Sequence, residues 1–200
     1  MEKRIVFATG NKDKMREIRE ILDGLDFEIL SMKEAGISVD VEENGATFEE
    51  NALIKAKAVA EQTDAIVLAD DSGLEVDYLN KEPGVYSARY LGRDTSYDVK
   101  NEIILNRLSG VPKEERSARF VCAIAAVFPD GEFVIKKGVM EGYIGEKAMG
   151  ENGFGYDPIF YLEEYGCSSA ALTRQRKNEL SHRGKALREI RTELARRMQG

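Results

Sequence analysis

The sequence predicts an α/β fold built on a mixed β-sheet that is flanked by helices. In the first half of the chain, short apolar segments alternate with amphipathic segments of helical period. Two long strand-like segments around a turn follow later, which adds an antiparallel pair to an otherwise parallel pattern. The 200 residues, 42% of them hydrophobic, suit a single compact domain, and no linker or internal repeat divides them.

The predicted strands are short segments in which apolar, β-branched and aromatic residues cluster between turn signals. In chain order they cover residues 4–8, 27–31, 65–69, 74–79, about 118–128, about 132–143 and 159–162. The third strand runs into the acidic segment 70–73 (D-D-S-G), which we interpret as a turn. Pro129-Asp130-Gly131 is expected to form the turn of the late hairpin.

The predicted helices carry apolar side chains at helical spacing. In chain order they cover residues 12–22, 47–61, 96–108 and 181–198. Asn11 is placed to cap the first helix, Thr47 and Glu50 form a capping box on the second, and Ser181 caps the last. In the third helix, Val99 is expected to face inward with the other apolar side chains.

Composition excludes several classes of protein. No apolar run is long enough to span a bilayer, and the N-terminus lacks the apolar stretch of a signal peptide. Cys122 and Cys167 lie far apart without metal-site spacing, so we expect two free thiols in a reducing cytoplasm. The net charge of −7 argues against a protein that coats nucleic acid, and the basic C-terminal helix is best explained as a solvated face. A small polyanion remains a possible ligand if basic residues converge and a metal ion assists.

The junction between the first strand and the first helix has the features of an anion site. Such a junction leaves backbone N–H groups unpaired and aimed at one point. Gly10 allows close approach, Asn11 caps the helix, and Lys14 brings a positive charge back to the same point. The alternative is an ordinary turn between strand and helix with a surface lysine.

The acidic residues predict a metal site. Asp70 and Asp71 follow a buried strand, where adjacent carboxylates repel each other unless a cation compensates. Mg²⁺ suits such a site, and Asp71 could hold the metal or take a proton from an attacking water. Glu42 and Glu43 form a second acidic pair that could supply another ligand, and Lys55 could border a cleft. The alternatives are an Asx-turn with solvated acids and a solvated acidic loop.

Two later segments could recognise a base. The loop at residues 150–158 packs three glycines around aromatic side chains, which suits a stacked base, although a structural loop with core aromatics is the alternative. His182, the one histidine, lies at a helix start beside Arg183 and shortly after Lys177, where it could bind a purine or a phosphate. A lone histidine is otherwise a structural residue. No Walker-type P-loop is present.

Taken in order, these segments resemble the inosine triphosphate pyrophosphatase family, which hydrolyses non-standard purine nucleotides. The motifs are T-G-N-x-x-K (9–14), T-F-E-E-N-A-L-I-K-A (47–56), A-D-D-S-G-L (69–74), P-G-V-Y-S-A-R-Y (83–90), G-F-G-Y-D-P-I-F (153–160) and S-H-R-G-K-A-L (181–187). They span nearly the whole chain. The resemblance implies one domain over residues 1–200, with a long mixed sheet, two lobes and a nucleotide-binding cleft between them, usually in a homodimer. It also implies Mg²⁺-dependent hydrolysis of ITP, dITP and XTP to the monophosphate and pyrophosphate.

The resemblance also implies roles for individual residues. Asp71 resembles the general base and a metal ligand, and Glu42 or Glu43 resembles the second ligand, with the register leaving open which. The residues that would contact phosphates or lie next to the substrate are Thr9, Gly10, Asn11, Lys12, Asp13, Lys14, Lys55 and Ser72. The residues that would recognise the purine are Phe154, Gly155, Tyr156, Asp157, Lys177, His182 and Arg183.

Three other functions compete with this one. A related pyrophosphatase could prefer modified pyrimidine nucleotides, which a comparison of UTP, dTTP and ITP would reveal. A nucleotide-sensing module would bind without hydrolysis, although two carboxylates beside a triphosphate make sense mainly with a metal present. A nucleic-acid-binding role rests only on the basic C-terminal helix, and the net charge disfavours it.

Overall fold

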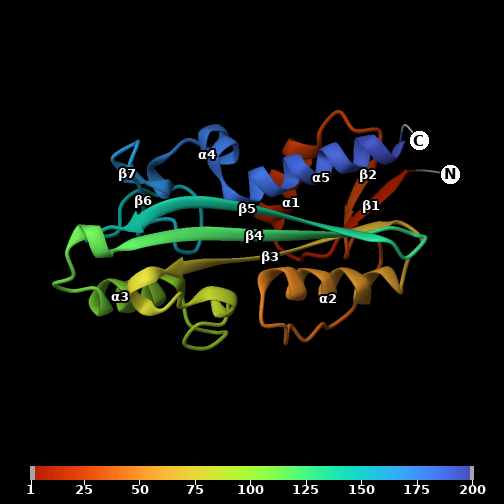
Figure 1. Ribbon diagram of the computed structural model, residues 1–200. Coiled ribbons are helices and arrows are strands. Elements are labelled where there is room, and N and C mark those ends of the chain that lie inside the picture. Colours follow the sequence, from red (N-terminus) through yellow and green to blue (C-terminus); the bar gives the residue numbers. More distant parts are fainter. Residues whose placement is uncertain (1–2, 199–200) are drawn as a thin grey trace. The chain divides into compact units, whose positions relative to one another are not determined.

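The computed structural model describes residues 3–198, and the chain divides into two compact units. Unit 1 comprises Met1–Asp71, Cys122–Gly138 and His182–Gly200, and unit 2 comprises Ser72–Val121 and Val139–Ser181. The elements in chain order are β1 (Arg4–Phe7), α1 (Lys12–Leu22), β2 (Glu28–Ser31), α2 (Phe48–Ala60), β3 (Ile66–Val76), α3 (Tyr97–Arg107), β4 (Ser117–Val127), β5 (Phe133–Ile144), β6 (Phe160–Leu162), β7 (Cys167–Ser168), α4 (Arg174–Leu180) and α5 (His182–Met198) (Figure 1).

The predicted fold class, an α/β fold with a mixed sheet flanked by helices, is confirmed. The strands follow the order β2-β1-β3-β4-β5-β6-β7, and β3, β4 and β5 each contain residues of both units. Pairing is parallel where β1 meets β2 and β3, and antiparallel where β6 meets β5 and β7. The single domain and the cleft between lobes stay predictions.

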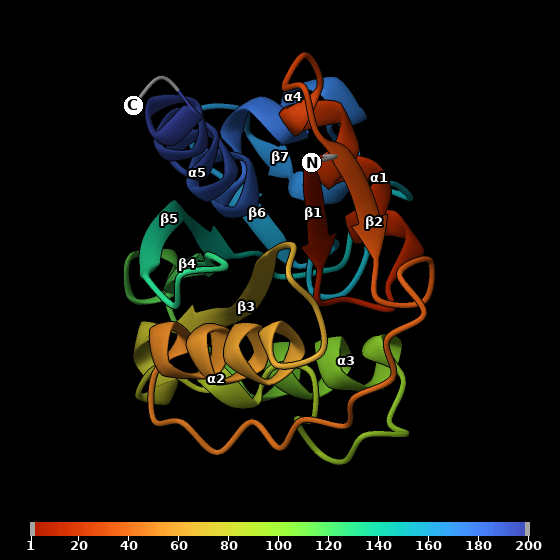
Figure 2. The ribbon, with the colours of Figure 1, turned by 90° about the vertical axis from the view of Figure 1, so that its right-hand side faces the viewer.

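In unit 1, helices cover both faces of the strands. Helices α1 and α5 lie on one face, and α2 lies on the other (Figure 2). The first face is held by buried apolar side chains of α1 and α5 against β1, β3 and β4, among them Ile18, Leu187, Phe7, Leu68 and Ile124. This packing holds α1 and α5 against β3, with the N-terminal ends of both helices near the middle of that strand.

Unit 2 has its own core, in which Leu74, Ile104, Met140 and Phe160 are buried together. Helix α3 contributes Ile104 to this core, and Leu108, the residue that caps the helix, also belongs to it. The buried Lys100 lies one helical turn before Ile104. Val99 lies one position off that stripe and is 44% exposed, so the prediction that it faces inward is wrong.

The acidic segment 70–73 is not a turn, and the two predicted strands around it are one continuous strand, β3. The prediction failed because local turn preference was overridden by partners that other elements bring to each carboxylate. Successive side chains of a strand point to opposite faces, so Asp70 and Asp71 do not converge as they would in a turn. The short elements β7 and α4 were not predicted.

The predicted helix starts are confirmed in detail for α1 and α2. Asn11 Oδ1 accepts a hydrogen bond from Lys14 N at 3.2 Å, and Thr47 Oγ1 accepts one from Glu50 N at 3.1 Å. The Glu50 carboxylate accepts from Ala46 N at 2.7 Å, one residue before the donor of a regular capping box.

Two further predictions are also confirmed. Both cysteines are free thiols. Within residues 3–198, no helix is long and apolar enough to cross a membrane.

Candidate active site

Asp71 lies in the middle of β3 with a side chain that is almost wholly buried. Asn51, on the first turn of α2, donates from Nδ2 to Asp71 Oδ2 at 3.0 Å. Burial raises the pKa of Asp71 to about 6, and the charges of Glu43 and Asp70 add to this rise against the opposing effects of Asn51 and Lys55. A carboxylate whose pKa lies this close to neutral can accept a proton and give it up again, which suits a general base.

Asp70, the preceding residue, has the opposite character. Its carboxylate is 1% exposed and binds Lys14 Nζ at 3.0 and 3.2 Å and Arg183 Nε at 3.3 Å. Burial alone would raise the pKa of Asp70, but Lys14, Arg183 and Lys55 together hold it well below its usual range. Asp70 therefore stays ionised and organises the cations of α1 and α5 on one face of β3.

Lys55 links this strand to the acidic loop. Its Nζ lies 2.7 Å from Glu43 Oε1 and donates to the backbone oxygen of Asp70 at 3.0 Å. Burial alone would lower the pKa of Lys55, but Asp70, Glu43 and Asp71 together raise it, so the ammonium stays charged. Glu43 is half-buried in this contact, whereas Glu42 is exposed. The sequence left open whether Glu42 or Glu43 is the second predicted metal ligand. Of the two, Glu43 is the one that contacts Lys55.

The donor set around Asp71 fits Mg²⁺. Glu43 and Asp71 are near enough for the charge of one to raise the pKa of the other. Across residues 3–198, no group of three His, Cys, Asp or Glu side chains comes together as a metal cage. Mg²⁺ in nucleotide enzymes needs no such cage, because one or two carboxylates are completed by substrate phosphates and water.

The predicted phosphate-binding junction is ordered by its own side chains. Thr9 Oγ1 accepts from Asn11 N at 3.2 Å, and Asn11 in turn caps α1. A Cβ on Gly10 would meet no atom within 4 Å, so no packing contact requires glycine there and the space before the loop is open. Lys12 is exposed, and the Asp13 side chain lies outside the described part of the structure.

In unit 2, part of the predicted purine group comes together. Asp157 is buried, and its Oδ2 accepts from Phe154 N at 2.8 Å and lies 2.5 Å from Lys177 Nζ. The Lys177 ammonium lies 4.9 Å from the centroid of the Phe154 ring, which is 39% exposed. Tyr156, by contrast, belongs to the core, as the structural alternative held, and its hydroxyl donates to Ser87 O at 2.7 Å.

The remaining members of that predicted group are distributed differently. His182 and Arg183 are buried at the start of α5, in unit 1. Arg183 binds Asp70 and also lies 2.8 Å from Glu17 Oε2. These ion pairs place Arg183 beside the predicted phosphate-binding junction. Ser72 is half-buried in β3 and is the first residue of unit 2.

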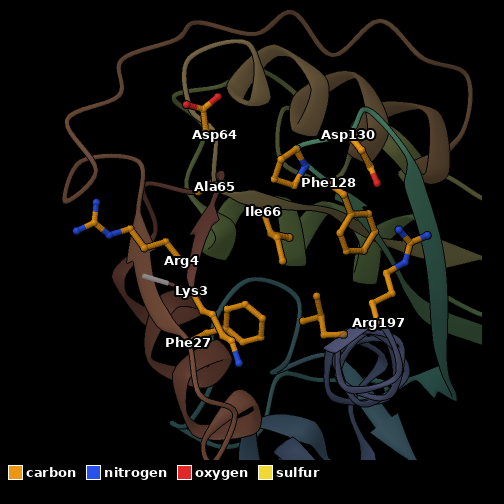
Figure 3. Close-up of a pocket in the computed structure, with 11 residues that line it drawn as sticks. Lys3, Arg4, Phe27, Asp64, Ala65, Ile66, Phe128, Asp130 and Arg197 are labelled. Carbon is orange, nitrogen blue, oxygen red and sulfur yellow. The ribbon is translucent and has the colours of Figure 1, made fainter. Parts of the chain in front are cut away.

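A cavity of about 470 Å³ in unit 1 lies apart from these residues. It is lined at the start of β1 and β3 by residues that include Arg4 and Ile66, and by Phe128 and Arg197 (Figure 3). Asp71 lies five residues further along β3, about 16 Å away at the rise of an extended strand. None of the predicted site residues lines this cavity.

Three contacts of the predicted site residues were not predicted. Asn51 and Glu17 were not among the predicted site residues. Asn is a weak helix former, so its presence inside the predicted helix was a signal that could have pointed to Asn51. Asn101 was also missed, and its Nδ2 donates to Gly155 O at 3.1 Å next to Phe154.

Comparison with known proteins identifies the family to which the chain is similar. Residues 5–193 match the model of the Ham1 family. The chain is similar to the dITP/XTP pyrophosphatase of Bacillus cereus, with 48% identity over 94% of this chain and 93% of the relative. It is also similar to the dITP/XTP pyrophosphatase of Clostridium perfringens, with 46% identity over 96% and 97% of the two chains. Among solved structures, a HAM1 protein from Coxiella burnetii matches with a TM-score of 0.89 and 41% identity, covering 98% of this chain and 100% of that one.

Proposed function

This chain belongs to the Ham1 family, and from that premise we propose that it hydrolyses non-standard purine nucleoside triphosphates. The proposed substrates are ITP, dITP and XTP, and the proposed products are the monophosphate and pyrophosphate. The names of the relatives, dITP/XTP pyrophosphatase, support the substrate class. The observation that carries the chemistry is the buried Asp71, whose pKa is raised to about 6 beside Lys55 and Glu43.

In the proposed reaction, Asp71 takes a proton from the attacking water. The water oxygen bonds to the α-phosphorus, and pyrophosphate leaves with the electron pair of the broken P–O bond. Lys14 and Lys55 attract the phosphates, and Asp70 keeps the Lys14 ammonium in place. Glu43 and Asp71 are the residues that would hold Mg²⁺, whose charge would offset that of the leaving pyrophosphate.

For the base, we propose stacking on the exposed ring of Phe154 in unit 2. The Lys177 ammonium, which lies over this ring, is a donor that suits the oxygen of a 6-oxo purine. A 6-amino purine would set donor against donor, which is costly in a buried site and selects against ATP. His182 and Arg183 remain proposed members of the purine group.

The test is pyrophosphate release from a panel of nucleoside triphosphates, with Mg²⁺ and with EDTA. We expect release from ITP, dITP and XTP that EDTA abolishes, with ATP and GTP nearly inert. Activity mainly on UTP and dTTP would keep the chemistry and overturn the purine specificity. Binding of ITP without release in Mg²⁺ would favour a nucleotide sensor instead.

We also propose a homodimer in the cytoplasm. Large apolar side chains are exposed in unit 2, among them Tyr78, Tyr86, Leu91 and Val99, and we propose that they contribute to the contact between the two copies. The two free thiols fit a reducing compartment. Light scattering on the purified protein measures the mass directly, and a monomer at micromolar concentration would contradict the dimer.

A further inference from the structure

Asn51 is buried without any exposed surface, on the first turn of α2. An amide in such a place loses its hydrogen bonds to water and must replace them within the protein. Asn is also a weaker helix former than Ala, so helix stability does not explain the residue.

The two ends of this amide bind two different segments. Nδ2 donates to Asp71 Oδ2 at 3.0 Å, and Oδ1 accepts from Gly45 N at 2.8 Å. The orientation of the amide is fixed, because a backbone N–H can only donate and so must face the oxygen. The nitrogen is then left for the carboxylate of Asp71, which accepts.

Gly45 is suited to this contact by its lack of a side chain. A Cβ at this position would lie 2.8 Å from Asn51 Oδ1 and 2.7 Å from Glu50 Cβ. Only glycine therefore brings the loop backbone so close to α2. Two residues earlier, the same loop carries Glu43, which binds Lys55 at 2.7 Å.

We propose that Asn51 is a positioning residue that holds Asp71 and the loop carrying Glu43 in one fixed arrangement. One side chain thereby sets both the orientation of Asp71 and the place from which Glu43 reaches toward it. Mutation of residues that hold metal ligands in this manner commonly lowers metal affinity or activity about 10- to 100-fold. The inference deepens the proposed function, since the importance of Asp71 and Glu43 rests on it.

The test uses the full chain with Asn51→Asp, Asn51→Ala and Gly45→Ala. Asn51→Asp keeps the shape and the acceptor for Gly45 but replaces the donor to Asp71 with an oxygen. Gly45→Ala disturbs the amide from the loop side, where the new Cβ would also press on Glu50 Cβ, and leaves the donor to Asp71 in place. Asn106→Asp, which makes the same chemical change on an exposed helix position, is the matched control.

Two quantities are measured: the dissociation constant of the free protein for Mn²⁺, which prefers the same oxygen ligands as Mg²⁺, and kcat and KM for ITP with Mg²⁺. Asn51→Ala is expected to weaken Mn²⁺ binding, and both Asn51 variants are expected to lower kcat about 10- to 100-fold, with KM changed by less than about threefold. Gly45→Ala is expected to act in the same direction, and the control is expected to match the wild type.

A folded Asn51→Asp protein with wild-type Mn²⁺ affinity and kcat would overturn the proposal. So would a change confined to KM, because that would assign Asn51 to substrate binding. Should the Asn51 variants not fold, Gly45→Ala with wild-type values for both quantities would overturn it equally. If the wild type releases pyrophosphate from no nucleotide, the proposed function fails, whereas the Mn²⁺ titration still decides the role of Asn51.

Discussion

Replacing Asp71 with Asn is expected to stabilise the metal-free protein while abolishing hydrolysis. The wild-type carboxylate is 8% exposed, and its pKa is raised from 3.8 to about 6, mainly by burial. Its ionised form is therefore less favourable in the folded protein than in the unfolded chain. Asn has the same shape and no charge, and its Oδ1 can accept the hydrogen bond that Asn51 Nδ2 donates.

The sign and size of the effect follow from the two pKa values. Because the folded pKa is the higher one, folding stability falls as pH rises from 3.8 and stops falling above about 6. A rise of this size corresponds to about 3 kcal/mol at pH 8, about half of that at pH 5, and little at pH 4. The Asn variant should recover most of this amount, and the recovery should shrink as the pH is lowered.

The measurement is thermal unfolding of both proteins in EDTA at pH 8 and pH 5. For a chain of this length, about 3 kcal/mol corresponds to a Tm higher by roughly 6 to 12 °C. Asp64→Asn, a change at an exposed carboxylate, is the control and should leave Tm unchanged. An Asp71→Asn protein no more stable than the wild type at pH 8, or equally stabilised at both pH values, would refute the reasoning.

Three further changes test other parts of the structure. Asp70→Asn removes the carboxylate that binds Lys14 and one of the two carboxylates that bind the buried Arg183, and we expect a loss of about 3–5 kcal/mol in urea unfolding. Gly138→Ala puts a Cβ where His182 O lies 2.0 Å away, so the start of α5 must move, and we expect a loss of about 1–3 kcal/mol with lower kcat. Lys177→Met removes the cation that lies 2.5 Å from buried Asp157, and we expect a higher KM for ITP with unchanged Mn²⁺ affinity.

Local patterns in the sequence were enough to predict most elements. The helix at residues 12–22 has the bounds of α1, because its cap at Asn11 and its apolar stripe are both encoded within one short segment. The acidic segment was mispredicted for the converse reason. Its turn-like composition is local, whereas the partners that keep it extended come from α1, α2 and α5, far away in sequence.

The site was predicted as a set of residues but not as a set of contacts. Sequence could not choose between Glu42 and Glu43, because the choice depends on which of them reaches Lys55. It also did not reveal that Arg183, one of the predicted purine-binding residues, has Asp70 and Glu17 as partners. Both sets of contacts depend on how separate elements of the chain pack together, for which a single sequence carries no signal.

The proposed general base can be assigned because the side chains of β3 alternate between the two faces of the sheet. Asp70 and Asp71 are chemically identical neighbours, yet the strand turns them to opposite faces, where they meet different partners. Asp70 meets two cations that keep it ionised, so it cannot accept a proton near neutral pH. Asp71 meets an amide and a second carboxylate in a buried place, which brings its pKa to about 6. Environments that push the pKa values of two like groups apart in this way help to assign their roles, and here they support Asp71 as the proposed base.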